Sequence, residues 1–202
     1  MGRDVDTDEV IDGNRMNRRK LLAAVAGAFL VGLAAIAVIE GHHAVLRDDD
    51  DYDDDDEGGR AAVARALTFA KVSLQQGLTA SELEGQPISA QFKVDRGTFQ
   101  LSIYTSKDGT FSEVLVDYQS GNIAKVQPIT EGEDLATAKL QSAAMAKAKI
   151  SLKQVVDNAV AQAPGLHAIS VVPGLRDGRA VASVVLLRKE EEEFRVIHQV
   201  LE

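Results

Sequence analysis

The sequence has no cysteine and no tryptophan. Without cysteine the chain has no disulfide bond, thiolate nucleophile or cysteine-ligated zinc site. Aromatic residues make up only 4% of its 202 residues, so we expect a core of Val, Leu, Ile and Ala. No Walker loop, G-x-S-x-G, H-E-x-x-H or dinucleotide fingerprint is present. We therefore expect a protein that is not an enzyme and holds no cofactor.

A surplus of positive charge is also missing. The net charge is −9, and the stretch RDDDDYDDDDE at residues 47–57 supplies −8 of it. The rest of the chain is therefore close to neutral. Nucleic-acid-binding domains usually carry a basic patch or stripe that contacts the phosphates, and we accordingly expect no nucleic-acid partner.

One long apolar run is present, and it begins at Leu21 and ends at Ile39. Its 19 uncharged residues give a helix of about 28 Å, close to the hydrocarbon thickness of a bilayer. Residues 1–20 end in the basic segment RMNRRK, whereas Glu40 and the Asp run follow the apolar run. Basic residues remain on the cytoplasmic side. The sequence thus predicts a single-pass inner-membrane helix over 21–39, with a cytoplasmic N-terminus and a periplasmic C-terminal part.

A cleaved export signal is the alternative for the same region. Arg18-Arg19 followed by Leu21-Leu22 loosely resembles a twin-arginine signal, and cleavage near Ala37 would release a periplasmic protein. The apolar run exceeds the usual 7–15 residues of a signal core, which favours an uncleaved signal anchor. The N-region is also long for a signal peptide unless translation starts at Met16 rather than Met1.

Residues 40–59 are predicted to be an acidic, disordered linker, because such dense like charges repel one another. A cation site is the alternative, since carboxylates suit Ca²⁺ and Mg²⁺. Its weak candidate ligands are Asp48, Asp50, Asp53 and Asp55. The spacing does not match an EF-hand, because the glycines follow the Asp run.

From residue 60 onward the chain repeats one plan. AKVSLQQ at 70–76 and AKISLKQ at 148–154 share five identical residues. An Ala-rich helical stretch precedes each phrase, and an amphipathic helix follows it. Ser73 and Ser151 are placed as the N-caps of these second helices. Two units are therefore predicted, at 60–130 and 131–202.

Strands follow the helices in both units. Apolar and polar residues alternate at 88–94 and 99–105, so each strand should bury one face. Further strands are predicted at 110–118, 169–172, 180–187 and 192–201, with Gly-containing turns between neighbours. Ile169 follows Ile88 by 81 positions rather than 78, so about three residues are inserted between helix and sheet in the second unit. The predicted class is α+β, with helices packed on small antiparallel meanders.

These patterns resemble the PepSY domain family. The resemblance rests on Val72-Ser73-Leu74, Val116-Asp117, Ser120-Gly121 and Ile123 in the first unit, and on Ile150-Ser151-Leu152 in the second. The second unit reaches Glu202 without a Val-Asp-x-x-Ser-Gly element. We expect structural roles as caps, turns and core for the motif residues: Ser73, Leu74, Val116, Asp117, Gly121, Ser151 and Leu152.

The resemblance implies a function through binding rather than catalysis. PepSY domains occur in propeptides of thermolysin-type metallopeptidases and in exported or membrane-anchored bacterial proteins, and no catalytic residues come with the family. The expected function is to bind and modulate, by inhibition, peptidases or other envelope proteins. Cation sensing through the Asp run is the alternative. His198 lies in a strand pattern and is predicted to be a half-buried packing residue.

Overall fold

The computed structural model describes residues 54–188 and 193–202, and their fold is α+β with one antiparallel sheet, in agreement with the predicted class. The helices are α1 (Asp54–Leu67), α2 (Leu74–Ser81), α3 (Gly132–Met145) and α4 (Leu152–Gln162). The strands are β1 (Gln86–Asp95), β2 (Thr98–Lys107), β3 (Thr110–Val116), β4 (Ile123–Ile129), β5 (His167–Arg176), β6 (Arg179–Arg188) and β7 (Glu193–Val200).

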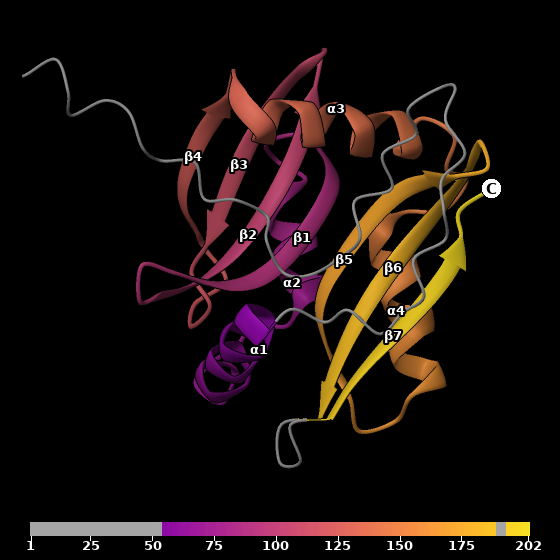
Figure 1. Ribbon diagram of the computed structural model, residues 1–202. Helices are drawn as coiled ribbons and strands as arrows, with labels where there is room; N and C mark the ends of the chain where they lie inside the picture. Colours follow the sequence, from indigo (N-terminus) through magenta and orange to yellow (C-terminus); the bar gives the residue numbers. More distant parts are fainter. Residues whose placement is uncertain (1–53, 189–192) are drawn as a thin grey trace, which may run out of the picture.

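The strands of both units form one seven-stranded sheet with the order β4-β3-β2-β1-β5-β6-β7 (Figure 1). The two meanders meet where β1 pairs with β5, in the register Ala90↔Val171 and Gln91↔Ser170. The sequence predicted a meander in each unit but not this junction. Four strands of the first unit therefore lie on one side of this junction, and three strands of the second unit lie on the other.

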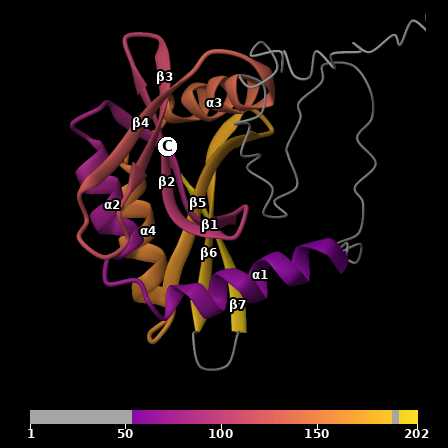
Figure 2. The same ribbon diagram turned by 90° about the vertical axis from the view of Figure 1, so that its left-hand side faces the viewer.

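Helices lie on both faces of the sheet (Figure 2). The helices α2 and α4 lie side by side on one face, and the Gln199 amide of β7 donates to the Val155 carbonyl of α4 over 3.1 Å. On the other face, Ser89 of β1 donates to the Gln141 side chain of α3 over 2.8 Å. The sheet is therefore the central layer between two helical layers.

The two units match closely in length and spacing. Helices α1 and α3 have 14 residues each, and their first residues, Asp54 and Gly132, are 78 positions apart. Helix α4 has 11 residues where α2 has 8. The three inserted residues predicted between helix and sheet are thus accommodated as extra length of α4. Helix α1 begins at Asp54, so residues 54–59 of the predicted linker are helical.

Local sequence signals explain the caps and the hairpins. Ser73 accepts a hydrogen bond from Gln76 N, and Ser151 accepts one from Gln154 N, each in a complete capping box. The predicted N-caps are confirmed. Tight hairpins join β1 to β2, β2 to β3 and β5 to β6, and both central residues of each have positive φ: Arg96-Gly97, Asp108-Gly109 and Asp177-Gly178. Such type I′ turns match the twist of the strands they connect.

The polar face of β1 differs from expectation. Its alternation predicted one buried face, yet Ser89 and Gln91 on the other face are also buried, at 0% and 3% exposure. Helix α3 lies over this face, where its Asp134 accepts a 2.8 Å hydrogen bond from the buried Tyr104 hydroxyl. The central strands therefore bury both faces, one apolar and one polar.

Candidate functional site

The motif residues that open helices α2 and α4 act as helix caps and core residues. Ser73 and Ser151 are the N-caps, and Leu74 and Leu152 follow them into the core with 0% and 2% exposure. Val116 ends β3 and is also buried. Their side chains therefore anchor helices and fill the interior, and Ser73, Ser151 and Leu152 also line the pockets described below.

Asp117 organises the turn between β3 and β4. Its carboxylate accepts hydrogen bonds from the backbone amides of Ser120 at 2.6 Å and Gln119 at 3.1 Å. These bonds, led by the Ser120 amide, lower the pKa of the Asp117 carboxyl. Gly121 has φ of 78°, a conformation that favours glycine. The geometry of the turn therefore accounts for Asp117 and Gly121 of the motif, and neither residue needs a catalytic role to explain its presence.

Groups suited to catalysis or metal binding are scattered in the part of the chain that the structure describes. His198 is exposed rather than half-buried, because β7 is an edge strand, and its Nδ1 lies 2.9 Å from Ser183 Oγ. Among residues 59–188 and 193–202 no three His, Asp or Glu side chains gather as metal ligands. The candidates Asp48, Asp50 and Asp53 lie outside these residues, and Asp55 lies in the first turn of α1.

The membrane prediction concerns residues that the structure does not describe. The apolar run at 21–39 lies outside the described residues. Among the helices of the described ranges, none combines the length and apolarity that a bilayer crossing requires.

The two edge strands of the sheet differ in chemistry. Strand β4 contains Pro128 and Lys125, which both oppose pairing with a further strand. Proline has no amide hydrogen to donate, and a charged side chain keeps an edge solvated. The β4 edge thus carries two features with which proteins prevent edge-to-edge association.

Strand β7 has neither proline nor lysine, and pairs with β6 in an unbroken register from Arg188↔Glu193 to Val181↔Val200. Its Val196 and Val200 are each 46% exposed and lie on the same face of the strand. The charged residues of the strand are Glu193 and the exposed Arg195, which pair with each other at 3.3 Å, and Glu193 also pairs with Arg188 at 3.0 Å. This regular edge with exposed apolar side chains is suited to accept another extended chain.

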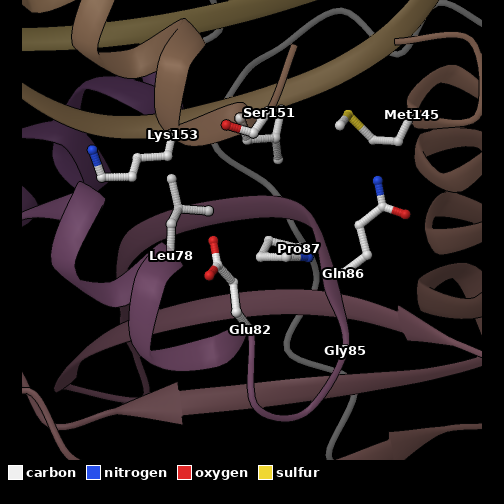
Figure 3. Close-up of a pocket in the computed structure, with 9 residues that line it drawn as sticks. Leu78, Glu82, Gly85, Gln86, Pro87, Met145, Ser151 and Lys153 are labelled. Carbon is white, nitrogen blue, oxygen red and sulfur yellow. The ribbon is translucent and has the colours of Figure 1, made fainter. Parts of the chain in front are cut away.

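Two pockets lie where the units meet in the layer of α2 and α4. The first, of about 260 Å³, lies between the end of α2, the start of β1, the end of α3 and the start of α4 (Figure 3). The second, of about 300 Å³, lies between the end of α1, the start of α2, the end of α4 and the start of β5. Each pocket is therefore built from both units.

The repeat relates the two pockets to each other. Residues 78 positions apart occupy corresponding places: Leu67 and Met145, Ser73 and Ser151, Gln75 and Lys153, Glu82 and Val160. At the strand starts the offset is 81, as for Pro87 and Ala168. Sequence reasoning missed both pockets because their walls come from distant segments, although the repeated phrase marks one wall of each.

Comparisons with known proteins add little. No family model matches the sequence, and no curated protein matches it. A solved structure from Clostridium difficile 630, described as a "putative lipoprotein", is similar with a TM-score of 0.30 and 7% identity over 59% of this chain and 86% of that one. A TM-score this low does not indicate a shared fold.

Proposed function

We propose that this protein is a non-enzymatic binding module of the bacterial cell envelope, which takes an extended segment of a partner protein along β7. The observation that carries the proposal is the contrast between the edges, because β4 has Pro128 and Lys125 and β7 has exposed Val196 and Val200. A strand added to β7 gains main-chain hydrogen bonds, and its alternate side chains cover the two valines.

The proposed location follows from the N-terminal sequence. The apolar run from Leu21 to Ile39 serves as a single-pass anchor, and the basic residues before it keep the N-terminus in the cytoplasm. The described domain then faces the periplasm. Cleavage near Ala37 would instead release it into the same compartment, so either form presents β7 to envelope proteins.

The proposed partner class comes from the PepSY resemblance, and it is a peptidase or another envelope protein that the module modulates by inhibition. An extended segment of such a partner has the form that pairs with a sheet edge. Supporting this assignment are the motif residues at Val116, Asp117 and Gly121, together with the Ser73 and Ser151 caps.

Lysine substitutions on the two edges test the proposal. A photocrosslinking residue at position 196 in the full chain should give a defined adduct in intact cells, and the same residue at position 126 on β4 should not. Adding V200K to the chain with the photocrosslinking residue at position 196 should abolish that adduct. Adding V126K should leave it unchanged, since Val126 is 40% exposed on the β4 edge. The purified full chain should also lower the peptidase activity of envelope extract, and the V196K/V200K variant should not. Equal adducts from both edges would reject the β7 assignment.

A further inference from the structure

The first pocket has an apolar floor. Leu78, Met145 and Leu152 are exposed by 1%, 5% and 2%, and they come from α2, α3 and α4 respectively. Pro87 at the start of β1 closes one side. With a volume of about 260 Å³ the hollow suits a single long side chain rather than a cofactor or an oligosaccharide.

The mouth of this pocket presents one unpaired negative charge. The exposed Glu82 lines it, and in Figure 3 its carboxylate points between Leu78 and Pro87. Within the described residues no hydrogen bond or ion pair reaches the Glu82 side chain. Lys153 also lines the mouth, but its ammonium is paired with Asp157 at 2.7 Å and points away from Glu82.

The position of Glu82 is unfavourable in the protein alone. Glu82 is the C-cap of α2, and the last turn of α2 contains no basic residue. The helix macrodipole places partial negative charge at this end, so a carboxylate there is destabilising and a cation is stabilising. A cationic group bound at the mouth would therefore be attracted by both Glu82 and the end of α2.

The second pocket provides an internal comparison. Val160 occupies the position that corresponds to Glu82, so the carboxylate is absent there. Lys71 is at the rim of that pocket instead. The two pockets share their architecture, and a carboxylate lines the first pocket but not the second.

We propose that the first pocket binds a lysine side chain of a protein partner, with its aliphatic stem on Leu78, Met145 and Leu152 and its ammonium at Glu82. Lysine combines an apolar stem with a charged head in this way. The site is independent of the β7 edge, and it stands whether or not a strand pairs there.

Methionine methyl NMR provides a direct test, because the chain has three methionines and Met145 lines the pocket. The full chain is labelled with ¹³C-methyl methionine in detergent micelles, and the Met145 signal is assigned with M145L. The probes are Nα-acetyl-lysine N-methylamide and its norleucine analogue, which has a comparable stem and no charge. We expect a saturable shift of the Met145 signal with the lysine probe, at an affinity about threefold to fivefold higher than for norleucine.

The charge dependence comes from a matched pair of variants. E82Q should remove the preference for lysine over norleucine, and E84Q should retain it, since Glu84 does not line the pocket. The preference should also decrease in 0.5 M salt. An unmoved Met145 signal, equal affinity for the two probes, or an unchanged preference in E82Q would each overturn the proposal. The probes do not require strand pairing, so failure of the β7 proposal and failure of this one are separate outcomes.

Discussion

The backbone amide of Lys149 donates a 2.7 Å hydrogen bond to the carbonyl of Leu201. In the first unit the amide of Lys71, which is 78 positions earlier, donates over 2.9 Å to the carbonyl of Tyr118. The same connection between the helical phrase and the end of the meander is therefore present in both units. It uses main-chain atoms, so the second unit keeps it without the Val-Asp-x-x-Ser-Gly element.

Replacing Leu201 with alanine should lower the free energy of unfolding by about 2–4 kcal/mol, because its side chain is fully buried. The backbone bond to Lys149 remains in this variant, so the loss reports the packing alone. Urea unfolding of the full chain, followed by circular dichroism, measures it. Leu83→Ala is the control, since Leu83 is 78% exposed and the change should stay within about 0.5 kcal/mol. Equal effects of the two substitutions would contradict this packing role.

The twin N-caps should contribute similarly to stability. Ser73→Ala and Ser151→Ala each remove a hydrogen bond of 3.2 Å that the serine hydroxyl accepts from a backbone amide. The donors are Gln76 N and Gln154 N, respectively. We expect a loss of about 1 kcal/mol for each in urea unfolding. The double variant should lose the sum, because the caps share no partner. Replacement by Asp, another good cap, should restore most of the stability, and a failure to do so would argue against the capping role.

Local features of the fold were predictable from the sequence, because they depend on a few neighbouring residues. Ser73 and Ser151 indicated helix starts, and Asp108-Gly109 and Asp177-Gly178 indicated hairpins, with mechanisms that operate within four residues. The junction of β1 with β5 was not predictable. It joins Gln91 to Ser170 across 79 positions, and no local residue type specifies such a pair.

The candidate sites were less predictable than the fold. Each pocket combines segments from both units, so its shape depends on how the units meet. The burial of Ser89 likewise depends on Gln141 of α3, 52 positions away. The alternation in β7 was visible in the sequence, but only the strand order places Val196 and Val200 on an edge.

Replacing a helical glycine with alanine should have opposite effects on stability in α1 and in α2, because only the glycine of α2 lies against the sheet. A Cβ on Gly77 would lie 2.5 Å from Cδ2 of the buried Leu101, whereas one on Gly59 would meet nothing within 4 Å. Gly77→Ala should therefore lower the free energy of unfolding by about 1–3 kcal/mol. Gly59→Ala should raise it by about 0.5–1 kcal/mol. Thermal and urea unfolding measure both, and stabilisation by Gly77→Ala would show that α2 moves away from β2 without strain.

Tyr104 should connect β2 to α3 through its hydroxyl, which donates to Asp134 Oδ1 over 2.8 Å. Tyr104→Phe should lower the free energy of unfolding by about 1 kcal/mol at neutral pH. Burial, and then the hydrogen bond to Asp134, raise the pKa of the Tyr104 phenol well above its usual range.

The sign of the alkaline effect follows from that raised pKa. A group with a raised folded pKa contributes its stability below its unfolded pKa, about 10 for tyrosine, and loses it as the pH rises. The stability difference between wild type and Tyr104→Phe should therefore shrink above about pH 10, as measured by urea unfolding. A difference that grows in this range would refute the assignment.

Acid should affect the β3–β4 turn through Asp117. The pKa of its carboxyl is lowered by hydrogen bonds, first from Ser120 and then from Gln119, so the carboxylate stabilises the fold above its unfolded pKa of about 4. That contribution is lost as the pH falls through the lower folded pKa. Asp117→Asn keeps an acceptor oxygen and removes the titration. The stability difference between wild type and Asp117→Asn should therefore be constant from pH 7 to about 5 and decrease below about pH 4.

Asp108→Asn is the matched control for this titration. Asp108 also lies in a turn between strands, with φ of 51°, a conformation that asparagine tolerates. No backbone amide of the described residues donates to the Asp108 carboxylate. Asp108→Asn removes one negative charge from a turn without such hydrogen bonds, so it controls for the general effect of charge on urea unfolding from pH 7 to 3. If Asp117→Asn and Asp108→Asn gave the same pH profile, the acid sensitivity would be a general charge effect, and the Asp117 turn would not be its source.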